Sequence, residues 1–121
     1  MKTARQSFDD SMSEADLERS VVDMAHAFGW YVAGFRPARV TRKGQETWET
    51  PVKHDGKGFP DLVLVRGYSD AGRGLLFVEI KAMKGTLSRD QQIWANLIVE
   101  AGGRYYCWRP SDMDEIERVL K

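Results

Sequence analysis

Three charged residues lie beside or within two apolar segments near the middle of the chain. Asp61 precedes the apolar run Leu62–Arg66, and Glu79 and Lys81 lie at the end of the run Leu75–Lys81. Two carboxylates and a lysine are side chains that suit metal-assisted hydrolysis of a phosphodiester, since Mg²⁺ is typically held by one or two carboxylates together with waters and phosphate oxygens. Such chemistry requires that the fold bring the three side chains together.

The two apolar runs are predicted to pair as an antiparallel hairpin, because a loop that contains Gly and Asp joins them. Residues two apart share a face of a strand, so Glu79 and Lys81 share one face, and Ile80 belongs to the other, wholly apolar face. Asp61 and Glu79 are equidistant from Asp70 in the connecting loop. Pairing in that register would place the two carboxylates close together, with Lys81 beside them.

A divalent cation would relieve the repulsion between Asp61 and Glu79, which otherwise raises the pKa of one of them. The backbone carbonyl of Ile80 is a further candidate ligand, and Lys81 is a candidate to orient or deprotonate an attacking water. The competing interpretation is a buried Asp–Lys–Glu ion-pair cluster, in which mutual attraction offsets only part of the cost of burying the charges. Spacing alone does not decide between the two.

The elements that must hold these residues follow from the spacing of apolar side chains. Ser13 is a candidate N-cap of a first helix that Gly29 ends, and a strand is predicted over Trp30–Arg36. After the hairpin, Ser88 is the candidate cap of a second helix, and Ser111 that of a last helix, with a strand over Arg104–Pro110 between them. The apolar side chains expected to face the core on these three helices are Leu17, Val21, Met24, Ala25, Phe28, Ile93, Trp94, Leu97, Ile98, Ile116, Val119 and Leu120.

Residues 37–58 show no sustained periodicity and are predicted to form a long loop, with at most a short strand near Thr47–Val52. Residues 36–89 carry eleven basic and six acidic side chains, whereas the segments on either side carry more acidic than basic ones. A polyanion would therefore contact the middle of the chain, although a solvated Lys and Arg surface gives the same pattern. The candidate phosphate contacts in the loop are Arg39, Arg42, Lys43, Lys53 and Lys57.

The chain has 121 residues, of which 42% are hydrophobic, enough for one domain with a core. We expect residues 1–12 to be an N-terminal tail and residues 13–121 to form that domain. The single Cys107 has no partner for a disulfide within the chain, which favours a reducing, cytoplasmic setting. The sequence contains neither the ~18 apolar residues of a membrane span nor the apolar region of a signal peptide. His26 and His54 have no partners at the spacing of zinc ligands.

The combination of Pro60-Asp61 with Glu79-x-Lys81 resembles the PD-(D/E)XK nuclease superfamily. The segments KGFPDLVLV, LLFVEIKAMKGTLSRDQ and AGGRYYCWRP are similar, more narrowly, to the VRR-NUC family. The resemblance extends from about Ser13 to the C-terminus. It implies an α/β fold with a restriction-endonuclease-like core, in which a mixed central β-sheet is flanked by α-helices. It also implies a Mg²⁺- or Mn²⁺-dependent DNA endonuclease that acts on Holliday junctions or other branched DNA.

The resemblance carries over to individual residues. By position, Asp61, Glu79 and Lys81 match the catalytic residues of the family. Gln91 matches a glutamine on the following helix, where it would contact phosphate or support the site. The family also places a metal-binding glutamate on its first helix, which is a further expected residue of the site. Glu18 is our choice for that ligand and Glu14 is the alternative, because both lie on the same shoulder of the first predicted helix.

Two other functions remain open on the sequence alone. One is a different nuclease of the same superfamily, either restriction-like or specific for RNA. The other is a non-catalytic module that binds nucleic acid and keeps the fold. If the substrate is a four-way junction, a homodimer is expected, because one domain supplies one active site and resolution needs two symmetric cuts. A phage or mobile element is a plausible source of so small a domain.

Overall fold

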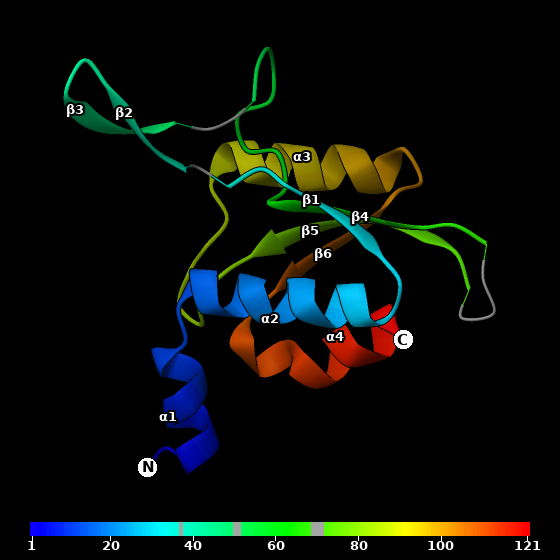
Figure 1. Cartoon of the computed structure of the whole chain (residues 1–121). Helices are drawn as coiled ribbons and strands as arrows, with labels where there is room; N and C mark the ends of the chain where they lie inside the picture. The colour runs from blue at the N-terminus through cyan, green and yellow to red at the C-terminus, as the bar shows by residue number, and fades with distance from the viewer. Residues whose placement is uncertain (37, 50–51, 69–71) are drawn as a thin grey trace.

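A four-stranded mixed β-sheet forms the centre of the molecule (Figure 1). The computed structural model describes residues 1–36, 38–49, 52–68 and 72–121. In order across the sheet, the strands are β1 (Tyr31–Gly34), β4 (Leu62–Arg66), β5 (Gly74–Ile80) and β6 (Arg104–Trp108). β4 is antiparallel to both β1 and β5, and β6 is parallel to β5. The expected α/β fold with a mixed sheet between helices is therefore confirmed.

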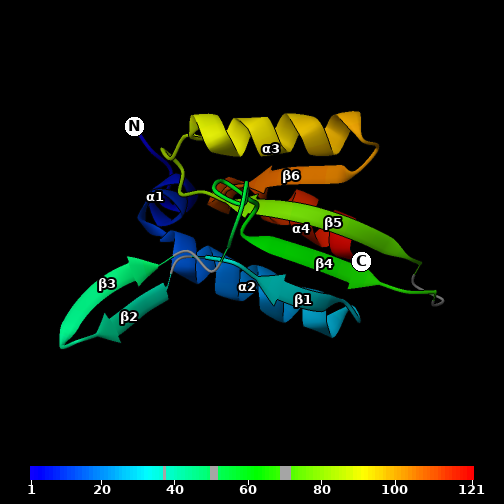
Figure 2. The same ribbon diagram turned by 90° about the horizontal axis from the view of Figure 1, so that it is seen from above.

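Helices cover both faces of this sheet (Figures 1 and 2). α2 (Glu14–Ala27) and α4 (Met113–Leu120) pack on one face, and α3 (Arg89–Glu100) lies on the other. The core between the sheet and the first two helices contains Leu17, Val21, Ala25, Trp30, Leu62, Leu64, Leu76, Val78, Ile80, Trp108, Ile116 and Leu120. Burial of each large side chain stabilises the fold by about 1.5–3 kcal/mol, so this layer holds the sheet in place.

The pairing of β4 with β5 has the predicted register. Leu62 lies opposite Val78, and the apolar side chains at both positions point into the core under α2 and α4. Residues one step away point to the α3 face, where Val63 lies opposite Phe77. The same alternation directs Glu79 to the α3 face. The connecting loop at residues 69–71, which includes Asp70, lies outside the described residues.

Side-chain caps fix where two helices begin. The Ser13 hydroxyl accepts a hydrogen bond from the backbone of α2, and Ser88 begins α3 in a reciprocal capping box, as predicted. The expected cap of the last helix is wrong. Ser111 lies inside a 3₁₀ turn, η1 (Pro110–Asp112), which precedes α4, because the Asp112 carboxylate accepts the backbone N–H of Arg109 (2.7 Å) and starts the turn early.

The N-terminal segment 1–12, expected as a tail, contains a helix, α1 (Ala4–Ser11). Thr3 and Gln6 form a second capping box, in which each side chain accepts the backbone N–H of the other residue. This Thr-x-x-Gln signal is present in the sequence but lacks a strong apolar stripe after it. None of the helices described here is both long enough and apolar enough to cross a membrane.

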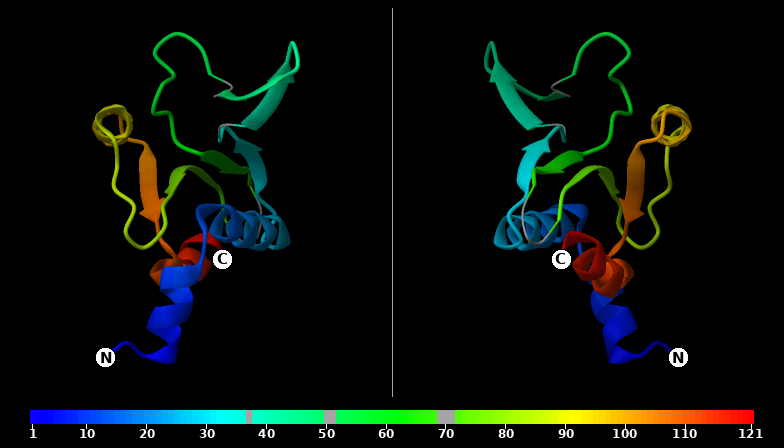
Figure 3. Two further views of the ribbon diagram at one scale, coloured as in Figure 1. Left: turned by 90° about the vertical axis from the view of Figure 1, so that its left-hand side faces the viewer. Right: turned by 90° about the vertical axis from the view of Figure 1, so that its right-hand side faces the viewer.

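Residues 37–58 were predicted as a long loop with a short strand near Thr47–Val52, and this prediction needs correction. The segment contains two paired strands, β2 (Ala38–Arg42) and β3 (Gln45–Glu49). Lys43 and Gly44 both have positive φ (52° and 77°), as in the type I′ turns that close two-residue hairpins. Lys-Gly is a weaker signal for this turn than Asn-Gly. The hairpin is separate from the four-stranded sheet and stands away from it (Figure 3).

The apolar side of α3 is only partly buried, which corrects a second expectation. Ile98 is buried, and Trp94 is half-buried, but Ile93 and Leu97 are 45% and 53% exposed. The reason is that α3 lies over the outer part of the sheet and packs mainly on β6, so the contact covers a narrow stripe of the helix. A row of apolar side chains on α3 is left facing solvent.

Candidate active site

The end of β5, the first turn of α3 and the first turns of α2 meet at one end of the sheet (Figures 1 and 2). Asp61, just before β4, is nearly buried there. Its Oδ2 atom accepts the backbone N–H of Ile80 (2.8 Å), and its carbonyl accepts the backbone N–H of Phe35 (2.7 Å). Backbone groups of the strands on both sides therefore hold this carboxylate in place.

Glu79 is the buried carboxyl group of the cluster, with 2% of its surface exposed. Its Oε1 atom accepts a hydrogen bond from Nε2 of Gln91 (3.3 Å), whereas its buried Oε2 atom has no partner. Burial, followed by a hydrogen bond with the Asp61 carboxyl group and repulsion from its charge, raises the pKa of Glu79 to about 9, against the opposing effect of Lys81. Without a further cation, Glu79 is therefore protonated at neutral pH.

Gln91 connects the start of α3 to Glu79. The side-chain Oε1 atom of Gln91 accepts the backbone N–H of Ser88 (2.8 Å), and the backbone N–H of Gln91 donates to the Ser88 hydroxyl (3.2 Å). With its oxygen committed to this capping box, the amide turns its N–H toward Glu79 (3.3 Å). The structure thus brings Gln91 to the carboxylates, as expected, through its side-chain amide.

Lys81 follows directly after β5 and is half-buried. Its backbone N–H donates to the carbonyl of Trp108 (3.0 Å), which extends the pairing with β6 by one step. Its charge acts on Glu79 and on Cys107, which lies opposite Glu79 on β6. Burial raises the pKa of the Cys107 thiol, which therefore stays protonated. Lys81 is the cation that the sequence predicted beside the two carboxylates.

A comparison with protein families matches residues 36–111 of the chain to the VRR-NUC domain. The chain belongs to the VRR-NUC family. This family is part of the PD-(D/E)XK nuclease superfamily, so membership implies a nuclease-type function with nucleic acid as the substrate. The matched segment contains Asp61, Glu79, Lys81 and Gln91 but not α2. Comparisons with curated proteins and with solved structures gave no significant match.

Arg36, which follows β1 of this VRR-NUC domain, contacts both candidate glutamates on α2. Its Nη1 atom lies 3.3 Å from Oε1 of Glu14, and its Nε atom lies 3.7 Å from Oε1 of Glu18. Burial raises the pKa of Glu18, Arg36 opposes this, and the Asp61 carboxylate adds to it. The charge of Asp61 thus reaches Glu18, and the charge of Glu14 likewise reaches Glu79, so both glutamates stay candidates for the helix ligand. Sequence reasoning missed Arg36, although its charge at the end of a predicted strand was visible.

The donor atoms fit a divalent cation in part. Among the residues that the structure describes, no three His, Cys, Asp or Glu side chains are gathered tightly enough to hold a metal by themselves. Glu79 and Glu18 nevertheless each have a buried carboxyl oxygen without a hydrogen bond, and that of Glu18 is the one that faces Arg36. Such atoms suit Mg²⁺, which keeps waters and substrate oxygens among its ligands. The Asp61 carboxylate and the Ile80 carbonyl are the further candidate ligands.

The basic residues predicted to contact phosphate fall into two groups. Lys43, at the turn of the β2–β3 hairpin, and Lys53, in the loop after it, are exposed. Lys57 is also exposed and lies 3.6 Å from the Asp90 carboxylate at the start of α3. Arg39 and Arg42 lie on β2, with side chains outside the part that the structure describes.

Proposed function

We propose that this VRR-NUC domain is a Mg²⁺- or Mn²⁺-dependent DNA endonuclease that acts on Holliday junctions or other branched DNA. The observation that carries the proposal is the buried Glu79 carboxyl group, which lies beside Asp61 and Lys81 and has one oxygen that receives no hydrogen bond from a protein donor. A structural ion-pair cluster would be expected to satisfy that oxygen. A cation-binding site requires it to be free.

Each residue then has a role in hydrolysis. Asp61, Glu79 and Glu18, with the Ile80 carbonyl, would hold the cation, and Gln91 would keep Glu79 oriented. The bound cation would stabilise negative charge on the phosphate and activate a water. Lys81 would orient that water through its ammonium group, and as the phosphorus–oxygen bond breaks, the proton that the water loses would pass to the oxygen of the leaving strand.

The test is cleavage of a panel of labelled duplex, single-stranded, flap and four-way DNA, each with Mg²⁺, Mn²⁺ or EDTA. We expect cleavage of branched DNA with either metal and none in EDTA. Asp61→Asn and Glu79→Gln should fold, lose cleavage and lose Mn²⁺ affinity in calorimetry. Arg118→Gln, an exposed change on α4, is the control. DNA binding without metal-dependent cleavage would instead support the non-catalytic module, and preferred cleavage of RNA would support an RNA nuclease.

The β2–β3 hairpin and the loop after it are the proposed surface for the DNA backbone. Lys43, Lys53 and Lys57 are exposed there, as a phosphate contact must be. Neutralising Arg39 and Arg42 with them should weaken binding about equally for all sequences. The slope of log affinity against log salt should fall by roughly one for each phosphate interaction that is removed. An unchanged slope in the multiple variant would place the DNA on another surface.

Two exposed apolar surfaces support the proposed homodimer. Tyr31, Val65 and Leu75 form a row across three strands and are 84%, 46% and 49% exposed. Ile93 and Leu97 form the second surface, on α3. Light scattering should give a dimer mass, and Leu75→Lys and Leu97→Lys, made separately, should show which surface pairs. A monomer both free and on a junction would remove the dimer from the proposal.

A further inference from the structure

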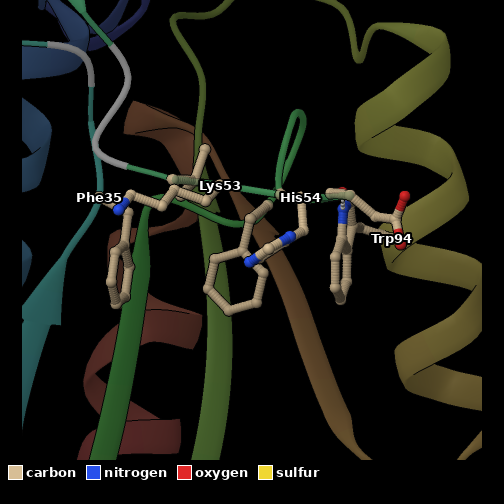
Figure 4. A pocket seen from close by; sticks show the side chains of 8 residues that line it. Phe35, Lys53, His54 and Trp94 are labelled. Atoms are coloured by element: carbon tan, nitrogen blue, oxygen red, sulfur yellow. Dashed lines mark hydrogen bonds between the residues drawn. The ribbon is translucent and has the colours of Figure 1, made fainter.

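An aromatic pocket of about 410 Å³ lies next to the candidate active site. Phe35 follows β1, Phe59 lies in the segment before β4, and Trp94 is on α3, so three separate parts of the chain supply its rings. Lys53 and His54, in the loop after the β2–β3 hairpin, complete the rim. Figure 4 shows Phe35 and Trp94 on opposite sides, with His54 between them.

Ring geometry and one hydrogen bond fix the walls of the pocket. The Phe59 ring is nearly perpendicular to those of Phe35 (87°, centroids 5.3 Å apart) and Trp94 (83°, 5.0 Å). The indole N–H of Trp94 donates to the carbonyl of Asp55 (3.0 Å), which ties the loop to α3. The pocket is therefore largely formed before any ligand binds, as is usual for binding sites of this size.

Backbone contacts connect the pocket rigidly to the carboxylates. The backbone N–H of Phe35 donates to the carbonyl of Asp61 (2.7 Å), and Phe59 precedes Asp61 by two residues. Trp94 follows Gln91 by one turn of α3. An occupant of the pocket would thus be held at a fixed offset from the scissile phosphate.

The chemistry of the lining indicates an aromatic, anionic ligand. Aromatic rings provide stacking surfaces, and the exposed Lys53 and His54 side chains provide hydrogen-bond donors at the mouth. His54 has a left-handed backbone (φ 58°), an uncommon conformation of a kind that clusters at ligand-binding sites. Among the described residues that line the pocket, only Asp55 carries a carboxylate, and its backbone carbonyl accepts the indole N–H of Trp94. A nucleotide combines a ring that stacks with a phosphate that pairs with such donors.

We propose that the pocket binds one unpaired nucleobase of the DNA strand next to the phosphate that is cleaved. A base within a duplex is stacked on both faces and does not expose them, so the occupant must be unpaired. This inference rests on the proposed function and adds to it. It gives a physical reason why the enzyme would select junctions, flaps or single strands, whose bases are free to enter, over fully paired DNA.

The test uses the full chain in EDTA, so that binding is measured without cleavage. The probe is a flap oligonucleotide with 2-aminopurine at one unpaired position, compared with a fully paired duplex. Stacking in the pocket should quench the 2-aminopurine fluorescence. Trp94→Leu should restore that fluorescence and lower affinity for the flap about tenfold, while duplex affinity changes less than about twofold. Trp94→Phe, which keeps a ring, should retain most of the flap affinity.

Two further variants control the experiment. Phe8→Leu removes an aromatic ring on α1 that is 62% exposed and outside the pocket, and it should change neither affinity nor fluorescence. Phe35→Leu tests the opposite wall if Trp94→Leu has a lowered unfolding temperature. Equal losses of affinity for flap and duplex in Trp94→Leu would overturn the proposal that the pocket binds a base. Unquenched 2-aminopurine fluorescence in the wild-type complex would overturn it as well. Absence of cleavage with every metal would overturn the proposed endonuclease and leave this binding result standing.

Discussion

Two adjacent regions of the molecule are built in opposite ways. The carboxylate cluster depends on strand pairing, which sets Leu62 opposite Val78 and so brings the adjoining Asp61 and Glu79 together. The aromatic pocket depends on tertiary packing, which brings Phe35, Phe59 and Trp94 together from segments far apart in the chain. The first region is buried and polar, and the second is half-buried and apolar. The difference suggests a division of work, in which one region reacts with phosphate and the other selects the strand.

A substitution at Gly58 should disturb both the carboxylate cluster and the aromatic pocket. Its φ is +85°, and a Cβ atom there would lie 2.5 Å from the backbone of Asp90 in the first turn of α3. Gly58→Ala should therefore lower the free energy of unfolding by about 2–4 kcal/mol, from backbone strain and overlap combined. Chemical denaturation measures this, and both flap selectivity and cleavage should fall in the same variant.

Gly44→Ala is the matched control. Gly44 also has a positive φ (+77°), but a Cβ atom there would meet nothing within 4 Å. It should cost about 1 kcal/mol from strain alone. Equal losses in the two alanine variants would mean that contact between the segment and α3 contributes little.

The next largest effect is expected from substitution of the proposed metal ligand on α2. Glu18→Gln should reduce the cleavage rate by at least about a hundredfold if Glu18 completes the metal shell, since residues that only support a metal ligand already cost 10–100-fold. Glu14→Gln also removes an ion pair with Arg36, which makes it a matched control, and it should reduce the rate less than about threefold. The reverse order would assign the ligand to Glu14. Small effects of both would remove α2 from the mechanism.

The Gln91 side chain both caps α3 and donates a hydrogen bond to Glu79, and two substitutions can separate these roles. Gln91→Glu retains the oxygen that accepts the Ser88 N–H but loses the N–H that donates to Glu79. We expect unfolding stability close to that of wild type and a rate lowered about tenfold, as for other residues that orient a metal ligand. Gln91→Ala should lose both stability and rate. Gln92→Ala, next along the exposed side of α3, should lose neither.

The sequence predicted the parts of the site that depend on short-range rules. The position of the loop between the two apolar runs gave the register in which Leu62 pairs with Val78, and Ser88 as the candidate cap gave the start of α3. It did not predict the I′ turn at Lys43, because polar strands joined by Lys-Gly carry a weak signal. The family resemblance, rather than physical reasoning, supplied a role for Glu18.

Features that depend on long-range packing were missed. Whether Ile93 and Leu97 face the core depends on how far α3 sits from the middle of the sheet, which periodicity does not encode. The contacts of Arg36 with α2 and the pocket around Phe59 likewise require the whole fold. Membership of the VRR-NUC family fixes the architecture, but the individual contacts come from the structure.

The last test uses the pH dependence of folding stability, which should depend on Glu79 in the carboxylate cluster and not on the aromatic pocket. The pKa of Glu79 is raised by burial and by Asp61 from 4.5 to about 9, so between these values the folded chain binds a proton that the unfolded chain has lost. Stability without divalent ions should therefore fall as the pH rises, by at most about 1.4 kcal/mol per pH unit. Thermal unfolding in EDTA at pH 6, 7 and 8 measures this fall.

Glu79→Gln should flatten the pH dependence, because the amide resembles the protonated acid and does not titrate. Glu117→Gln, an exposed change on α4, should leave the wild-type slope, and Trp94→Leu in the pocket should shift stability without changing the slope. Added Mg²⁺ should reverse the trend in the wild type, because a cation stabilises the ionised carboxylate more as the pH rises. If stability still falls with rising pH in Glu79→Gln, another group titrates. The case for Glu79 as a buried carboxyl group that ionises when a metal binds would then be weaker.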